Sequence, residues 1–297
     1  EPDEEAPAEE VAASEPEAPP APPAEVRISP IAKRVAAKLG VDLTGVVGTG
    51  RNGRISKEDV EAAARAQGLL AEESDEPPAF EVIKLTGTQK TAAKRLQEAK
   101  QQIPHFYLDA DVQTKRLAKV AKRADVSLNA ALLKAMGMAL EAVPEANVQF
   151  VDDTLHRYAK ADVGMAVATD RGLVVPILRD VGGASLADIA AAAKDLAVRA
   201  RDRKLVAADL EGGTCTVSNL GMFGVDRFQA IVNPPQTTIL AVGRSVDRAV
   251  VDDDDVEVRP VVSVSLSCDH RAVDGALGAR LLAAFRAAVE SGLEGCE

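Results

Sequence analysis

The sequence has few cysteines and no long apolar run, and both absences narrow the class of protein. Its three cysteines, Cys215, Cys268 and Cys296, fit neither a disulfide framework nor the paired spacing of metal ligands. A reducing cytoplasm is therefore the expected compartment. No stretch approaches the roughly eighteen uninterrupted apolar residues of a membrane span. We expect no membrane segment, no metal and no disulfide-stapled scaffold.

Basic residues are absent from residues 1–25, which hold nine acidic ones. This segment accounts for most of the net charge of −11, so the remaining chain is nearly neutral and nucleic acid is not an expected partner. Alanine, proline and glutamate make up almost all of it, which predicts a disordered acidic linker. Residues 71–81 are also acidic and contain Pro77 and Pro78, so they predict a second linker.

Residues 26–70 are expected to form a small helical unit. Ser29 and Pro30 begin a short helix that ends at Gly40, and Ser56 begins a second helix. Eight basic residues against four acidic ones give this segment a positive charge. A unit of about 45 residues is more often a docking module than an enzyme.

The loop between these helices contains Gly48, Gly50 and Gly53, which formally match the G-x-G-x-x-G pattern of dinucleotide-binding proteins. No buried strand precedes the pattern and no strand-helix-strand unit surrounds it, so we reject that function. We expect instead that the glycines allow the loop to adopt positive φ angles.

Residues 82–297 are expected to form one large domain. Strands and helices mix without regular alternation, which indicates an α/β domain with a large mixed sheet rather than a doubly wound one. The run from Asp252 to Asp255 offers carboxylates, but consecutive residues cannot all converge on a metal, and a solvated hairpin turn is favoured. Helices are expected at residues 89–101, 127–142 and 185–204, and strands at residues 106–112, 148–151, 162–168, 173–178, 214–218, 238–242, 248–251 and 256–266.

The last of these strands leads to a histidine. Leu266, Cys268 and His270 share one face by the period of two, and a helical segment begins after Asp274. Imidazole titrates near neutral pH and a carboxylate can fix its tautomer, so His270 and Asp274 are candidates for proton transfer. A structural histidine beside a helix-capping aspartate is the alternative that the spacing alone favours.

The residues around this histidine carry a family resemblance. The string Asp-His-Arg-Ala-Val-Asp-Gly at residues 269–275 resembles the active-site signature of the dihydrolipoamide acyltransferases of 2-oxo acid dehydrogenase complexes, and that of chloramphenicol acetyltransferase. The resemblance is closest to the acetyltransferases of pyruvate dehydrogenase complexes. It implies a chloramphenicol acetyltransferase-like domain over residues 82–297, preceded by a peripheral subunit-binding domain over residues 26–70. Four further blocks match in order: a Lys-Arg-Leu helix before Ile-Pro-His-Phe, Asp-Arg-Gly-Leu-Val-Val-Pro, Gly-Gly-Thr-Cys-Thr-Val-Ser-Asn-Leu-Gly-Met-Phe-Gly, and Asn-Pro-Pro-Gln.

This resemblance implies transfer of an acyl group between a dihydrolipoyl thiol and CoA. A thiol is mostly protonated at neutral pH, so the reaction needs a base, and His270 is the candidate. The attacked carbonyl becomes an oxyanion, to which Ser218 is implied to donate a hydrogen bond. Asp274 is implied to hold the site in shape, in part through Arg271. Lys94 and Arg95 are candidate contacts for a CoA phosphate.

The resemblance also implies partners. Lys33, Arg34, Arg51 and Arg54 are candidates for pairing with an acidic face of a partner enzyme. The expected partners are the 2-oxo acid decarboxylase component, dihydrolipoamide dehydrogenase and a lipoyl domain that carries lipoate. No lipoyl domain is visible, and the first linker fits one placed upstream. Members of the family form homotrimers, with the active site between subunits, and the trimers build a larger core.

Three alternatives stay open at this point. Cys268 is a rival nucleophile, because it lies on the same strand face as His270, and a Cys-His pair would imply an acyl-enzyme. The acyl group could be branched or a succinyl group, since few side chains decide it. A non-catalytic scaffold is the third alternative, although a scaffold has no need of His270, Ser218 and Asp274 together.

Overall fold

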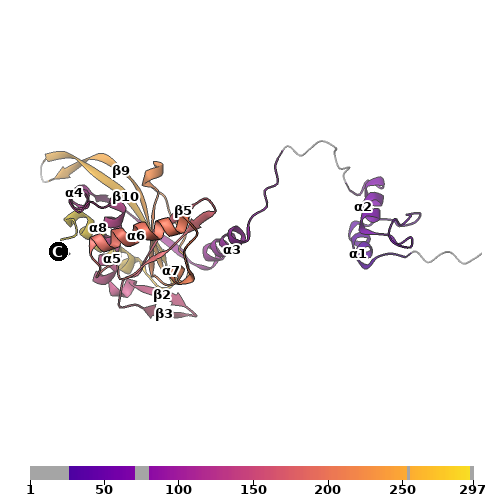
Figure 1. Cartoon of the computed structure of the whole chain (residues 1–297), viewed down its shortest axis with the longest axis horizontal. Helices are drawn as coiled ribbons and strands as arrows, with labels where there is room; N and C mark the ends of the chain where they lie inside the picture. The colour runs from indigo at the N-terminus through magenta and orange to yellow at the C-terminus, as the bar shows by residue number, and fades with distance from the viewer. Residues whose placement is uncertain (1–26, 71–79, 253–254, 295–297) are drawn as a thin grey trace, which may run out of the picture. The chain divides into compact units, whose positions relative to one another are not determined.

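The computed structural model describes residues 27–70, 80–252 and 255–294. Almost all of the two expected linkers therefore lies outside the described residues. The chain divides into two compact units, Glu1–Val82 and Ile83–Glu297 (Figure 1). Among the helices of the described residues, none has the length and apolar character required to cross a membrane.

The small unit consists of helices α1 (Pro30–Leu39) and α2 (Lys57–Ala66). The Ser29 hydroxyl accepts a hydrogen bond from Ala32 N at 3.1 Å, and Ser56 caps α2 in a reciprocal arrangement with Asp59. The side chains that the two helices bury against each other are small, which explains how so short a segment holds a core. That core consists of Ala32, Ala36, Val41, Ile55, Val60 and Ala64.

The loop glycines between α1 and α2 are needed for two different reasons. Gly53 has a φ of +69°, as expected for a residue in a left-handed turn. Gly48 and Gly50 do not have positive φ. A Cβ on Gly48 would lie 2.4 Å from the carbonyl carbon of Arg54, and one on Gly50 would lie 2.6 Å from the Arg54 oxygen. Close backbone approach, rather than conformation, therefore requires glycine at these two positions.

The large unit is built on a six-stranded mixed sheet, which confirms the expected fold class. The β4–β8 and β8–β9 pairs are parallel, whereas the other three pairs of neighbours are antiparallel. The strands lie in the order β1 (His105–Gln113), β10 (Asp255–Asp269), β9 (Thr238–Asp252), β8 (Cys215–Asn219), β4 (Val163–Met165) and β7 (Ile177–Leu178).

Helices cover one face of this sheet and form the main core with it. Leu266 on β10 and Leu281 and Phe285 on the last helix are almost fully buried there. Each such side chain contributes about 1.5–3 kcal/mol relative to an exposed position. The helices of the large unit are α3 (Gly87–Gln102), α4 (Lys115–Arg123), α5 (Leu128–Ala142), α6 (Leu186–Arg201), α7 (Ala207–Leu210) and α8 (Gly275–Ser291), with short 3-10 turns η1 (Pro144–Ala146) and η2 (Gly221–Phe223).

The other face of the sheet is lined by polar side chains and is crossed by a loop. Ser263, Ser265 and Ser267 of β10 are buried on this face. Ile239 of β9, which pairs with Ser267, packs there in a small apolar cluster. The loop supplies Val232 to that cluster, and α3 supplies Ala99. The sheet therefore separates an apolar layer of helices from a more polar layer.

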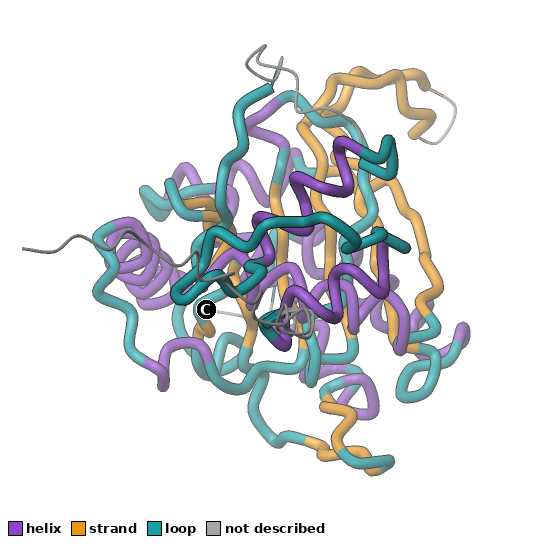
Figure 2. Tube along the Cα trace, turned by 90° about the vertical axis from the view of Figure 1, so that its right-hand side faces the viewer, coloured by secondary structure: helices purple, strands orange, loops and turns teal. Residues whose placement is uncertain are grey.

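The sequence-based strand boundaries are wrong in three places. β9 is one continuous strand rather than two, and with β10 it forms a long hairpin that projects beyond the rest of the sheet (Figures 1 and 2). The tip of this hairpin, residues 253–254, lies outside the described residues. The strand expected at residues 162–168 is divided into β4 of the main sheet and β5 (Val167–Thr169). The strand expected at residues 173–178 is divided into β6 (Gly172–Val174) and β7 of the main sheet, and β5 and β6 form a separate hairpin. The remaining hairpin is β2 (Val148–Val151) with β3 (Thr154–Arg157).

Helix α4 has no counterpart among the predicted elements. Only Leu117 and Ala121 of its nine residues are buried, and basic residues fill most of the other positions. Leu117, Val120 and Ala121 follow the helical spacing, so the sequence did carry an amphipathic signal for this helix, and the prediction missed it.

Candidate active site and docking surface

Strand β10 ends at Asp269 and delivers His270 into a tight turn before α8. The Asp269 carbonyl accepts hydrogen bonds from Ala272 N at 3.0 Å and Val273 N at 2.9 Å, which closes the turn. The backbone N–H of His270 donates to the Pro104 carbonyl at 3.1 Å. The backbone at His270 is therefore fixed from two sides, while its side chain is exposed.

The imidazole of His270 lies against one aromatic ring. The ring centroids of His270 and Phe106 are 4.8 Å apart, with the planes tilted by 55°. Among the described residues no hydrogen bond is recorded for the imidazole nitrogens, so the ring can accept a proton from a bound molecule. By contrast, His105 uses Nδ1 toward the Ile103 carbonyl at 2.9 Å and accepts from Val232 N at Nε2. His105 is thus engaged in structure.

An ion pair flanks His270 in sequence. The Asp269 carboxylate is almost fully buried and accepts from Arg271 Nη2 at 2.7 Å, Nε at 2.9 Å and the backbone N at 3.0 Å. These hydrogen bonds raise the pKa of the Arg271 guanidinium above its ordinary value. The guanidinium carbon also lies 4.1 Å from the centroid of the Phe150 ring. Sequence reasoning missed Asp269 and Phe150, although the alternation did place Asp269 on the face opposite His270.

Asp274 begins helix α8. Its Oδ1 accepts a hydrogen bond from Leu277 N at 2.8 Å, which is the geometry of an N-cap. The expected link from Asp274 through Arg271 is wrong, because Arg271 binds Asp269 with its whole guanidinium edge. Asp274 therefore acts on the turn through the helix backbone.

Ser218 lies on β8 and is half-buried. It pairs with Ala241 of β9, and Ala241 pairs with Ser265 of β10, five residues before His270. At about 3.3 Å per residue and about 4.8 Å per strand, the two residues are roughly 16 Å apart along the strands and roughly 10 Å apart across them.

The two residues also face opposite sides of the sheet. Ser218 shares its face with Thr216, which pairs with Ile239 on the polar side. His270 contacts Phe106, which pairs with Cys268 on the helix side. Within one chain, the geometry therefore does not bring Ser218 and His270 to one reacting group.

The thiol of Cys268 is a poor nucleophile in this fold. Its side chain is buried on the helix side, and burial raises its pKa to about 12. Cys215 is buried two strands away, and burial also raises its pKa to about 12. At neutral pH both residues are thiols rather than thiolates, which argues against an acyl-enzyme on Cys268.

Helix α3 carries Lys94 and Arg95, and both side chains are exposed. Lys94 lies 3.8 Å from Glu98 one turn later. About 12 Å of helix separates Lys94 from the end of α3 at Gln102, near the His270 turn. Neither cation is therefore in the immediate surroundings of the imidazole.

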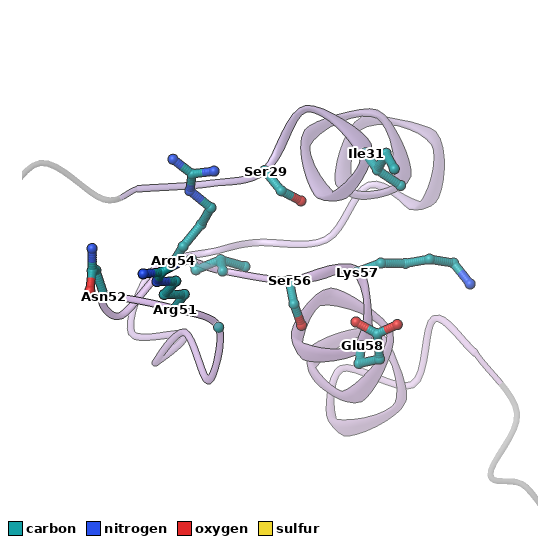
Figure 3. Close-up of a pocket in the computed structure, with 10 residues that line it drawn as sticks. Ser29, Ile31, Arg51, Asn52, Arg54, Ser56, Lys57 and Glu58 are labelled. Atoms are coloured by element: carbon teal, nitrogen blue, oxygen red, sulfur yellow. The ribbon is translucent and has the colours of Figure 1, made fainter.

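The small unit has its own cavity of about 570 Å³, open to solvent. The N-terminal ends of α1 and α2 lie beside it, and the loop between them brings Arg51 and Arg54 to its edge (Figure 3). Helix N-termini and cations both favour a negatively charged partner. Lys33 and Arg34 are exposed on α1 but do not line the cavity, whereas Lys57, which sequence reasoning did not single out, does.

Among the described residues, no group of three or more His, Cys, Asp or Glu side chains is placed to hold a metal ion. The residue types around His270 are instead suited to proton transfer and hydrogen bonding.

Comparison with known proteins places both units. Residues 77–294 match the catalytic domain of the 2-oxoacid dehydrogenases acyltransferase family, and residues 26–61 match the e3 binding domain. The dihydrolipoyllysine-residue acetyltransferase component of the pyruvate dehydrogenase complex of Rhizobium meliloti is 40% identical over 89% of this chain and 67% of that protein. The chain thus spans about two thirds of the length of such curated relatives.

Two solved structures resemble the large unit. The cubic core of a pyruvate dehydrogenase multienzyme complex has a TM-score of 0.67 and 31% identity over 74% of this chain and 95% of that one. Dihydrolipoamide acetyltransferase of Azotobacter vinelandii has a TM-score of 0.68 and 30% identity over the same shares. The latter structure concerns the catalytic roles of a serine, a histidine and an asparagine. In that protein the histidine lies 52 residues after the serine, and the asparagine lies four residues after the histidine.

Both intervals recur here, between Ser218 and His270 and between His270 and Asp274. The family that the sequence blocks predicted is confirmed, as is the expected mixed-sheet fold. The chain belongs to the 2-oxoacid dehydrogenase acyltransferase family, with the catalytic domain in its large unit and an e3 binding domain in its small one.

Proposed function

We propose that the chain transfers an acetyl group between a dihydrolipoyl thiol and CoA, with His270 as the base. The observation that carries the proposal is an exposed imidazole with free nitrogens, on a fixed backbone, at the position matching the histidine of the Azotobacter enzyme. The relatives are acetyltransferases, which favours acetyl over a branched or succinyl group.

The reaction can be written with the residues of this chain. His270 accepts the proton of the CoA thiol, and the resulting sulfur attacks the carbonyl carbon of the acyl-dihydrolipoyl thioester. Ser218 Oγ donates a hydrogen bond to the oxyanion that forms. When the carbon–sulfur bond to the lipoyl group breaks, the leaving thiolate takes the proton back from His270. No acyl-enzyme is needed, in keeping with the buried thiol of Cys268.

The site is completed by a second copy of the chain. Because Ser218 and His270 lie on opposite faces and roughly 19 Å apart in one chain, the serine of one copy must meet the histidine of another. A homotrimer within a larger core satisfies this requirement, and the similar solved structure is that of a cubic core. Exposed apolar side chains of the segment before α3, among them Phe80, Val82 and Ile83, are consistent with burial in such an assembly.

Two further assignments belong to this proposal. Asp274 sets the direction of α8 and of the His270 turn by capping the helix. Lys94 and Arg95 contact the phosphates of CoA, which is long enough to reach from α3 to the His270 turn. Lipoate enters as a substrate on a lipoyl domain. The reaction takes place in the cytoplasm, where Cys215 and Cys268 stay reduced.

The small unit docks partner enzymes of the complex. Arg51 and Arg54 at the cavity, with Lys33 and Arg34 on α1, provide a cationic surface for an acidic face of the dihydrolipoamide dehydrogenase or 2-oxo acid decarboxylase component. A scaffold that only docks partners is the second candidate function. The presence of Ser218, His270 and Asp274 at the matching intervals favours catalysis.

The test is the transfer of acetyl from acetyl-CoA to free dihydrolipoamide, which needs no lipoyl domain. His270→Ala is expected to lower kcat on the order of 10²-fold or more. His156→Ala is the matched control, because His156 lies on the exposed hairpin strand β3. Wild-type activity in His270→Ala would contradict the proposal, and an inactive wild type with acetyl, branched and succinyl donors would favour the scaffold.

A further inference from the structure

The turn that carries His270 is held by an ion pair between the residues on either side of the histidine. Asp269 precedes the histidine and Arg271 follows it, and the two side chains form a bidentate pair with distances of 2.7 and 2.9 Å. The Asp269 side chain is 1% exposed, whereas that of Arg271 is 36% exposed. A buried carboxylate is costly as an anion when it is unpaired, so the Arg271 guanidinium compensates this charge, while the hydrogen bond from Arg271 N to Asp269 Oδ1 does not depend on the side chain.

Arg271 is itself fixed in place. Its guanidinium lies over the Phe150 ring at 4.1 Å. The ring belongs to β2, and the Phe150 N–H donates to the Pro235 carbonyl at 3.0 Å in the loop that leads to β9. Asp269 N donates to the Thr237 carbonyl at 2.9 Å in the same loop. The two residues beside His270 are thus both anchored to residues 235–237, Asp269 directly and Arg271 through Phe150.

We propose that Arg271 is a positioning residue for the proposed acyl transfer: it clamps the turn between Asp269 and Phe150, which aims His270, and it cancels the negative charge beside the imidazole. The proposal rests on the proposed function of His270, since aim and charge matter only if the imidazole takes a proton. A planar guanidinium suits both tasks, because it binds a carboxylate bidentately and stacks on an aromatic face.

Other ionisable groups around the turn do not replace Arg271. Asp274 is engaged with the backbone of α8, and His105 with the backbone on both sides. Tyr107 on β1 accepts from Lys100 of α3 at 2.6 Å. Asp153, in the turn after β2, acts electrostatically on Arg271 and adds a second negative charge that Arg271 offsets. Loss of Arg271 would leave the surroundings of His270 more negative.

The expected effect has a definite sign. A nearby negative charge stabilises imidazolium over neutral imidazole, and the positive charge of Arg271 opposes that effect. Successive side chains on opposite sides of a backbone lie on the order of 8 Å apart. At that distance one uncompensated charge shifts the midpoint of a pH profile by about 0.5–1 unit. His270 must be neutral to accept a proton, so the acid limb of activity should move to higher pH.

The experiment measures His270 in two independent ways in the whole chain. The first is the pH dependence of kcat/KM for acetyl transfer to dihydrolipoamide. The second is the pH dependence of carbethoxylation of His270 by diethyl pyrocarbonate, followed by peptide mass spectrometry, which needs no activity. Both are compared among wild type, Arg271→Gln, Arg271→Lys and the double variant Asp269→Asn with Arg271→Gln. Arg280→Gln is the control, because Arg280 is an exposed cation near the start of α8.

Arg271→Gln should shift both midpoints upward by about 0.5–1 unit and lower kcat about tenfold with little change in KM for acetyl-CoA. Arg271→Lys keeps the charge but loses the planar fork, so its midpoints should stay within about 0.3 unit while kcat still falls. The double variant removes both charges and should return the midpoints to the wild-type value. Arg280→Gln should change neither quantity.

Unmoved midpoints in Arg271→Gln, or an equal shift in Arg280→Gln, would overturn the proposal. If Arg271→Gln lowers both kcat and the melting temperature but leaves the two pH midpoints unchanged, Arg271 has a structural role alone. An inactive wild-type chain would count against acyl transfer, while the carbethoxylation midpoints would still test the charge relationship between Arg271 and His270.

Discussion

Ser218 and His270 lie on opposite faces of the same sheet. Ser218 is level with Ser265 of β10, and His270 comes five residues after Ser265. The register between strands fixes this separation, because a shift of one residue would exchange the apolar and polar faces of β10. Small motions of the turn cannot close a distance of roughly 19 Å. The proposed site therefore depends on assembly as much as on the fold of one chain.

Cys268 should prove dispensable for catalysis. Its pKa, raised to about 12 by burial, keeps the thiol protonated at neutral pH. Cys268→Ala should retain most of the activity, with a loss of stability of about 1 kcal/mol from the small cavity beside Gly278. In a Cys296→Ser background, the folded chain should resist alkylation at pH 7. Isolation of an acyl group on Cys268 after reaction with acetyl-CoA would contradict the direct-transfer mechanism.

Asp274 should be replaceable by asparagine but not by alanine. Asparagine caps helices about as well as aspartate and stands at the matching interval in the Azotobacter enzyme. We expect Asp274→Asn to keep most of the activity and stability. Asp274→Ala loses the hydrogen bond from Leu277 N, which should cost about 1 kcal/mol in the free energy of unfolding and misplace the His270 turn. Chemical denaturation and kcat, measured side by side, check this; equal effects of the two substitutions would contradict the capping role.

Asp59 should make the small unit sensitive to acid. Hydrogen bonds from Ser56 N and from Thr49 lower its pKa from 3.8 to about 2. Because the folded pKa is below the unfolded one, the stabilisation is complete above about pH 5 and is lost as the pH falls toward 2. The protection of the Ile55 amide against exchange, relative to its intrinsic rate at each pH, should therefore fall over this range in the whole chain. Asp59→Asn should exchange faster at pH 6 and lose that pH dependence, whereas Glu61→Gln, in an exposed pair with Lys57, should behave as wild type.

Partner binding by the small unit should depend on its cations. Arg51→Gln combined with Arg54→Gln should weaken binding of dihydrolipoamide dehydrogenase at least tenfold, and Lys33→Gln with Arg34→Gln should weaken it in the same direction. Lys38→Gln at the far end of α1 is the control. Wild-type affinity, measured by calorimetry, should fall as salt rises from about 0.05 to 0.5 M. Binding that is indifferent to both salt and the arginine pair would refute an electrostatic docking surface.

Local sequence patterns predicted the parts of the fold that are set locally. Ser29, Ser56 and Ser127 each cap the helix that was expected to follow, because a serine hydroxyl can accept a hydrogen bond from a free backbone N–H of the first helical turn. The alternation that ends at His270 matches β10, since one face packs on helices and the other is polar. β9 was divided in the prediction because its outer part belongs to the projecting hairpin, where no core maintains an alternating pattern.

Long-range relationships were beyond the sequence. Nothing local distinguishes Asp269 from Asp274 as the partner of Arg271; the choice follows from the turn, which points Asp269 into the sheet and Asp274 along α8. The distance between Ser218 and His270 likewise depends on the order and register of β8, β9 and β10. The resemblance named the residues and implied a site between subunits, and the strand register gives the distance that one chain keeps between them.

Subunit complementation between Ser218→Ala and His270→Ala tests the central claim most directly. Each variant alone should be nearly inactive in acetyl transfer to dihydrolipoamide. Co-expressed in equal amounts and mixed at random in a trimer, they should recover about a quarter of wild-type activity, because that share of interfaces pairs an intact serine with an intact histidine. The two purified variants, mixed without dissociation, are the control and should stay inactive. Co-expressed variants that assemble but show no recovered activity would contradict a site shared between copies.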